Sequence, residues 1–327
     1  MDDPTHDVDW SGLFHALGPA GDTPRHLAAL LGDDAEAFVD GYSHLWSVTL
    51  RREGKAWPAT APTALLVAEL LDNPLLGPDD PSLPDAMLAY LYEVGVAADL
   101  GDQAGEIRAR VKDRAPELRA WTAEYVSTDA DGRARMWRDG TGLGELILDQ
   151  AALACFDLVP ALLRRTLPYL ASERARRRTC AAAAVGSLAR HPVASAQRPE
   201  LLKQLTSMVW AADSSHDLAT ILIAIGHLDG DTRPWLADPH FRRSGLRGPS
   251  AQPCRRRHSE PAADGTGAVA ASLRQVLWRP GTTPAAPVQV VPGPAHRPTR
   301  ELMPGVRDGG FHLDRGHWLS CGSGRRS

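Results

Sequence analysis

The sequence predicts an all-α protein: an α-solenoid of stacked antiparallel helix pairs, followed by an irregular C-terminal tail. Three observations support this fold class. Ala and Leu dominate the 327 residues and only 6% are aromatic, whereas sheet proteins are enriched in β-branched and aromatic residues. Apolar residues recur at helical spacing through the first 240 residues. One segment also repeats at an offset of 40 residues.

Four helices are predicted before residue 102. Thr23 and Pro24, ahead of RHLAALL, are typical of a capped helix start, and AEAFVDGYSHLWSVTLRR continues as a second helix after a short turn. WPATAPTALLVAELLDNP (57–74) supplies the third apolar face and DAMLAYLYEVGVAADLG (85–101) the fourth. A short turn joins the first two of these helices, and LLGPDDPSLP (75–84) is expected to form a loop before the fourth.

The middle of the chain alternates helices with expected loops. Residues 102–120 are charged and helical in pattern, and residues 127–145 contain the breakers STDADG and RDGTGLGE. Residues 145–170 read as two helices, ELILDQAALACFDL and PALLRRTLPYL, with Pro160 opening the second.

An internal repeat then appears. Laying ASERARRRTCAAAAVGSL (171–188) over AADSSHDLATILIAIGHL (211–228) aligns Gly186 with Gly226 at an offset of 40 residues. A period near 40 with two helices per unit is the spacing of HEAT and armadillo arrays, in which each unit leaves an apolar face for its neighbours to cover.

Three segments carry a resemblance to a known family. DWSGLFHALGPAGDTPRHLAALLGDD, WPATAPTALLVAELL and ADPHFRRSG resemble the HEAT-repeat proteins common in actinobacteria, some of which are described as HEAT/PBS-lyase-like after the bilin lyases. The resemblance covers roughly residues 8–245. It implies an architecture rather than an activity, because such arrays usually act as curved binding surfaces.

The charge distribution divides the chain. Residues 241–327 hold 14 Arg, no Lys and five acids, so this part carries +9 and the remainder −13. We predict a lead-in over 1–21, a HEAT-like repeat domain over 22–245 and a low-complexity Arg/Pro/Gly-rich tail over 246–327. The tail is either disordered or the product of a shifted reading frame, which in a GC-rich gene exchanges Ala, Arg, Gly and Pro codons; we favour the frameshift.

The four cysteines indicate a reducing compartment. They are Cys155, Cys180, Cys254 and Cys321, with no C-x-x-C pair, and the first two lie in Ala-rich helical patterns where a thiol acts as a small apolar filler. The acidic N-terminus lacks the features of a signal peptide, and no run of 18 uninterrupted apolar residues occurs. We therefore expect a cytoplasmic protein without a membrane span.

Candidate sites for small ligands are weak. Gly140, Gly142 and Gly144 could cradle a phosphate at a helix start, but no strand precedes them and the Lys-Ser/Thr ending is missing, so a connection between helices is the better interpretation. The four histidines before residue 50 have no paired ligand spacing: His6, His15, His26 and His44. In the tail, zinc-like spacings involve Cys254 with His258, or His312, His317 and Cys321. We expect no metal, no cofactor and no catalytic set.

One basic cluster stands out in the helical part. It comprises Arg164, Arg165, Arg174, Arg176, Arg177 and Arg178. DNA-binding helical arrays line a face with basic residues along several repeats, whereas here one cluster lies in a −13 background. We interpret this patch as either a solvated helix face or a surface that binds another protein, and do not expect a nucleic-acid partner.

The function expected from these observations is that of a non-enzymatic scaffold, which binds another protein through the concave face of the array. No Ser-His-Asp set, nucleophile elbow or paired-carboxylate motif points to catalysis. The alternative is an enzyme on a HEAT-like scaffold, either bilin-lyase-like or alkylpurine DNA glycosylase-like.

Overall fold

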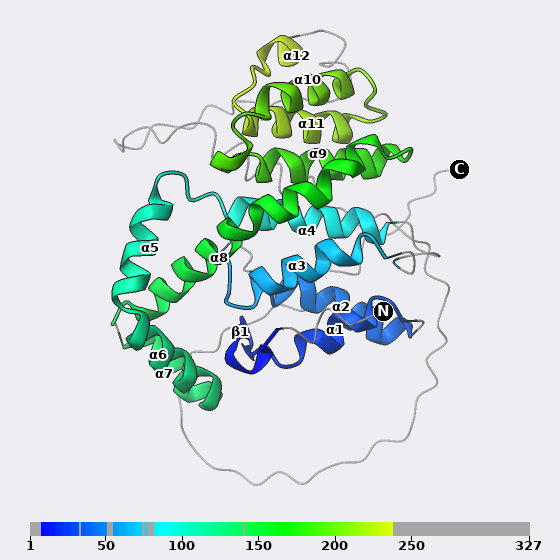
Figure 1. Ribbon diagram of the computed structural model, residues 1–327. Coiled ribbons are helices and arrows are strands. Elements are labelled where there is room, and N and C mark those ends of the chain that lie inside the picture. The colour runs from blue at the N-terminus through cyan, green and yellow to red at the C-terminus, as the bar shows by residue number, and fades with distance from the viewer. Residues whose placement is uncertain are drawn as a thin grey trace, which may run out of the picture. The chain divides into compact units, whose positions relative to one another are not determined.

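The computed structural model describes residues 8–237 apart from 33, 51–54, 74–75, 77–81 and 140. Within these residues the protein is mostly helical (Figure 1). The α-helices are α1 (Thr23–Ala29), α2 (Ala35–Ser47), α3 (Thr60–Leu70), α4 (Leu83–Ala97), α5 (Gln103–Asp113), α6 (Ala115–Ser127), α7 (Ala130–Arg138), α8 (Leu143–Thr166), α9 (Ala175–Leu188), α10 (Arg198–Val209), α11 (Ser215–His227) and α12 (Arg233–Ala237). The shorter elements are η2 (Trp10–Gly12), β1 (Phe14–His15), β2 (Gly18–Pro19), η3 (Leu167–Ala171) and η4 (Pro192–Ala194).

The main body is a stack of helices that bury one continuous core. α3 packs on α4 and α8, α4 and α8 pack on α9, and α9 packs on α11 (Figure 1). Tyr90, Met87 and Leu88 of α4 are completely buried in this core. Because α4 and α9 are separated in sequence by α5–α8, the helices that touch are not simply consecutive along the chain.

The 40-residue offset corresponds to two helices that lie side by side. α9 begins at Ala175 and α11 at Ser215, and the two pack along their lengths. At the contact, a Cβ added to Gly186 would lie 2.7 Å from Ala224 Cα, so only glycine permits this approach. A mostly helical fold is confirmed for the described residues, and the solenoid stays a prediction.

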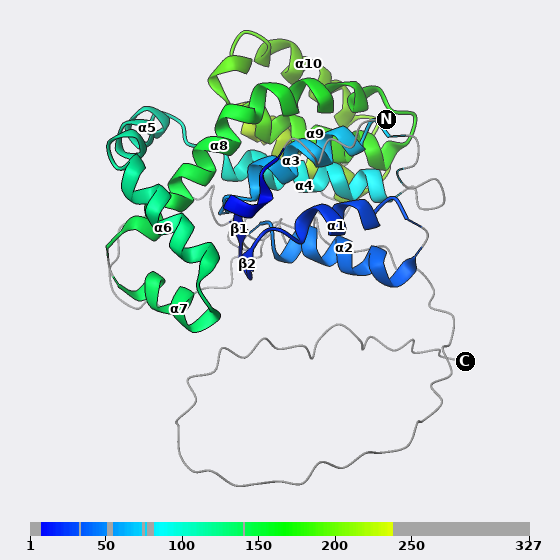
Figure 2. The ribbon, with the colours of Figure 1, turned by 60° about the horizontal axis from the view of Figure 1, so that its bottom comes forward.

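α5, α6 and α7 form a group to one side of the stack (Figures 1 and 2). The breaker run STDADG, expected to lie in a loop, instead starts α7. Asp129 is the N-cap of α7, because its Oδ1 accepts a hydrogen bond from the backbone N–H of Gly132 at 2.7 Å. The residue types that interrupt a helix in its middle are the ones that begin it well.

α8 is one helix where the sequence predicted two. It runs through Pro160 without a break and buries residues that include Leu162 and Leu163 against its neighbours. A proline within a helix costs about 3 kcal/mol, which packing on both sides of Pro160 offsets. Among the described helices, Leu143–Ala171 alone is long and apolar enough to cross a bilayer. Half of its apolar 18-residue stretch is buried inside the protein, as a core helix would be.

The lead-in to α1 forms a small hairpin that the sequence did not predict. β1 and β2 pair antiparallel, with Phe14 opposite Pro19 and His15 opposite Gly18. The Phe14 side chain enters an aromatic cluster with Trp57, Trp121 and Tyr125, and its ring centroid lies 4.2 Å from that of Tyr125. This packing fixes the hairpin, and so it also fixes the position of His15.

Candidate functional site

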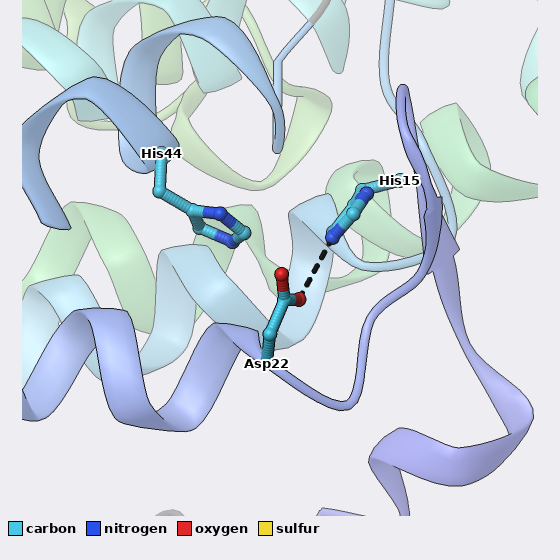
Figure 3. Close-up of side chains that lie close together, drawn as sticks. All are labelled: His15, Asp22 and His44. Atoms are coloured by element: carbon cyan, nitrogen blue, oxygen red, sulfur yellow. Dashed lines mark hydrogen bonds and ion pairs between the residues drawn. The ribbon is translucent and has the colours of Figure 1, made fainter. Parts of the chain in front are cut away.

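Three polar side chains from different elements meet at the N-terminal end of the described residues (Figure 3). His15 comes from β1, Asp22 directly precedes α1, and His44 comes from α2. One ligand atom of each lies within 4.8 Å of the other two. The side chain of His15 is 3% exposed and that of Asp22 45%, while His44 is 6% exposed overall, so the cluster is buried on one side and opens to solvent at the carboxylate.

Hydrogen bonds orient each member of this cluster. Leu17 N–H donates to His15 Nδ1 at 3.2 Å, which places the ring proton on Nε2, and Nε2–H donates to Asp22 Oδ1 at 3.0 Å. The hydroxyl of Thr23 lies 2.9 Å from His44 Nε2. Thr23 was expected to cap α1; its side chain is instead buried and serves to hold His44.

A third histidine extends the cluster toward solvent. His26 Nε2 lies 3.8 Å from Asp22 Oδ2, and its ring stacks on that of His44 with 4.2 Å between centroids. Burial, and secondarily the charge of His26, lowers the pKa of His44 to about 4. Burial opposes ionisation of Asp22, but the hydrogen bond from His15 and the neighbouring imidazoles lower its pKa overall. His44 is therefore neutral and Asp22 is ionised near pH 7.

The sequence showed these histidines but not their proximity. His15, His26 and His44 have none of the short spacings by which one helix presents two ligands. They converge because the chain leads from the β1–β2 hairpin directly into α1 and because α1 packs on α2. The signal available in the sequence was only the density of histidine in the first 50 residues.

The predicted arginine patch is largely occupied by contacts within the protein. Arg165 pairs with Asp72 at 2.9 Å, Arg177 with Asp85 at 3.1 Å, and Arg176 with Asp217 at 3.6 Å. These pairs cross from α8 and α9 to neighbouring elements of the stack.

The remaining three arginines are differently placed. Arg178 donates to the carbonyls of Ser172 and Glu173, at 2.9 Å each, and so stays fixed at the start of α9. Arg164 and Arg174 are exposed and take part in none of the ion pairs found among the described residues. The part of the patch that a partner can reach is therefore narrower than the six residues of the prediction.

Beside this patch the surface is apolar and slightly hollowed. Trp210, which follows α10, is 69% exposed. The next residues, Ala211 and Ala212, line a shallow pocket together with Ala175, Arg178, Thr179, Met208, Asp213 and Ile221. Its volume of about 230 Å³ includes space open to solvent. We call Trp210 and these lining residues the Trp210 surface.

The other predicted site residues fit their simpler interpretations. Gly142 adopts a positive φ of 71° between α7 and α8. A helix rather than a strand precedes it, which agrees with the predicted connection between two helices. Cys155 and Cys180 are buried, unbridged thiols as predicted, and burial raises the pKa of each to about 12. His6, Gly140, the tail and its cysteines and histidines lie outside the described residues.

Comparison with known proteins adds no relative. The chain gives no significant match to a protein-family model, to a curated protein or to a solved structure. The resemblance to HEAT-repeat proteins therefore rests on the sequence segments that carry it, and what is established is a mostly helical protein with a small N-terminal hairpin.

Proposed function

We propose that this protein is a HEAT-like α-solenoid that acts as a non-enzymatic scaffold and binds another protein through the Trp210 surface. The solenoid is supported by the 40-residue offset between α9 and α11, which lie side by side. The binding role is supported chiefly by one observation: a tryptophan that is 69% exposed beside a pocket.

The exposure of Trp210 is not explained by a role in packing the core of the protein. Tryptophan is among the residues that contribute most to protein–protein affinity, because its large ring buries much apolar surface at little cost in side-chain entropy. Other tryptophans of the chain, such as Trp57 and Trp121, are buried and stabilise the fold. Among the tryptophans that the structure describes, Trp210 is thus the one suited to a hot spot.

The pocket beside it is a shallow depression rather than an enclosed ligand site. Its volume of about 230 Å³ includes space open to solvent, so it offers a contact surface and does not enclose a small molecule. Ile221, Met208 and the alanines supply an apolar lining, while Arg178 is held at the rim by two carbonyls. An apolar side chain of the partner would rest on this lining, and a neighbouring carboxylate would pair with Arg178.

Arg174 and Arg178 decide the chemistry of the partner. They lie one helical turn apart at the start of α9, so their guanidinium groups are on the same side of the helix. Asp213 is the only acid that lines the pocket. We therefore expect a partner segment that combines an apolar anchor with acidic neighbours.

Photo-crosslinking in the native host tests this proposal. The photoreactive residue p-benzoylphenylalanine replaces Trp210 in one variant and Val39, which is 62% exposed on α2, in a matched control. We expect discrete heavier products from position 210, containing one protein identifiable by mass spectrometry. The purified protein should then bind that partner at least about 30-fold more weakly after Trp210→Ala, the loss of 2 kcal/mol that defines a hot spot.

The same measurements can reject the proposal. Identical products from positions 210 and 39, or an affinity unchanged by both Trp210→Ala and Arg178→Glu, would exclude the Trp210 surface. Val39→Ala should leave the affinity as it is, which separates a local effect from general loss of solubility.

A further inference from the structure

The cluster of His15, Asp22 and His44 has no part in the proposed scaffold function, and its composition is that of a metal site. We propose that these three side chains bind one divalent transition-metal ion of the Zn²⁺ or Co²⁺ class, with a coordination position left open toward solvent. The proposal rests on three potential ligand atoms that lie within 4.8 Å of one another on three separate elements (Figure 3).

The donor set selects the class of metal. Two imidazoles and one carboxylate suit zinc and its neighbours, whereas Ca²⁺ and Mg²⁺ prefer a shell made of oxygen atoms. Metal–ligand bonds of about 2.0–2.1 Å place tetrahedral donors ~3.4 Å apart. His15 Nε2 and Asp22 Oδ1 are 3.0 Å apart, and the other separations, at most 4.8 Å, have to shorten by up to ~1.4 Å.

Asp22 is the member of the set most open to solvent. It is 45% exposed and follows Gly21, around which even an added Cβ would meet nothing within 4 Å. The two histidines are buried and held by partners. Rotation of the Asp22 carboxylate shortens its own distance to His44, whereas any shortening between His15 and His44 requires their rings to move.

One neighbour of the ligands can act as the outer shell of a metal site. Histidine ligands normally donate a hydrogen bond through their second nitrogen, which orients the ring. The Thr23 hydroxyl, 2.9 Å from His44 Nε2, can accept that bond when the metal binds His44 through Nδ1. His26, 3.8 Å from Asp22 Oδ2, lies beside the position that is left open toward solvent.

Metal binding requires a definite proton movement. In the metal-free protein the single proton of neutral His15 lies on Nε2, because Nδ1 accepts from Leu17 N–H. When Nε2 donates its lone pair to the metal, that proton moves to Nδ1 and the ring stays neutral. Leu17 N–H then loses its acceptor, so its amide NMR signal should shift on metal binding.

Titration of the full-length protein with Co²⁺ under reducing conditions tests the site through ligand-field absorption, which reports coordination directly. The informative variant is Asp22→Asn, because this exposed side chain can change with little effect on folding, and His44→Gln is the second. His191→Gln is the control, since His191 lies outside the cluster, beside Phe156. Cysteines and histidines of the tail are common to all four proteins and give the same background.

We expect the wild type and His191→Gln to bind one Co²⁺ that Asp22→Asn binds at least about tenfold more weakly, with helical circular dichroism unchanged. The same ion should raise the melting temperature of the wild type more than that of Asp22→Asn. The proposal is wrong if Asp22→Asn titrates like the wild type, or if no Co²⁺ is bound beyond what Asp22→Asn retains. In that case the cluster only ties the hairpin to α1 and α2.

Discussion

Gly186 and Gly226 occupy equivalent positions in the two helices that the 40-residue offset relates, and their surroundings are opposite. A Cβ on Gly186 would lie 2.7 Å from Ala224 Cα, 2.8 Å from Ala224 Cβ and 3.0 Å from the Ala224 carbonyl oxygen. A Cβ on Gly226 would meet nothing within 4 Å. Substitution by alanine should therefore destabilise the protein at one position and stabilise it at the other.

The magnitude follows from the contact distances. Carbon atoms pack best ~3.5–4.0 Å apart, so a Cβ at position 186 forces α9 and α11 to separate by roughly 1 Å, which removes part of the dispersion energy along their contact. Overpacking of this kind costs about 1–3 kcal/mol. Alanine also favours a helix over glycine by up to about 1 kcal/mol, which reduces the loss at position 186 and is the whole effect at position 226.

Urea denaturation followed by far-ultraviolet circular dichroism measures both variants against the wild type. We expect Gly186→Ala to lower the free energy of unfolding by up to about 2 kcal/mol, the overpacking cost less the helix gain, and Gly226→Ala to raise it by about 0.5–1 kcal/mol. Equal stabilities for the two variants, or a Gly186→Ala protein more stable than the wild type, would refute the close packing of α9 on α11.

Two further predictions concern buried charge. Arg177→Met leaves the mostly buried Asp85 carboxylate without its partner and should lower the free energy of unfolding by about 3 kcal/mol. The double variant with Asp85→Leu should recover part of that loss. A single variant as stable as the wild type would contradict the role of this pair. Burial lowers the pKa of His216, so between that value and about 6.5 the unfolded chain binds more protons and the stability falls as the pH falls. Chemical denaturation at about pH 7 and 5 should therefore show a smaller loss for His216→Phe than for the wild type, and equal losses would assign the pH dependence to other groups.

Helix-forming segments could be predicted wherever apolar residues recur at helical spacing within one continuous segment. The helical patterns before residue 102 and between 171 and 228 correspond to α1–α4, α9 and α11. The errors came from residues whose effect depends on context. STDADG looked like a loop but caps α7, and Pro160 looked like a helix start but lies inside α8, where burial of the surrounding apolar residues outweighs the lost backbone hydrogen bond.

The candidate sites show the same limit. Six arginines were visible as a run, but only the structure shows that Arg165, Arg176 and Arg177 are paired with acids from other elements. Exposure of Trp210 was equally invisible, because the spacing of tryptophans along helices does not tell which ones face solvent.

By itself, the sequence determined the helical class of the described residues and the helical segments that became α9 and α11, since helical periodicity is a property of neighbouring residues. Tertiary structure alone decided that α4 packs on α9 across the intervening helices, and that His15, Asp22 and His44 meet at one point. Such meetings depend on the angle at which a hairpin folds back and two helices pack, which no short spacing encodes. The candidate metal site could therefore not be predicted from the sequence, because its three residues come from segments whose spacing shows no ligand pattern.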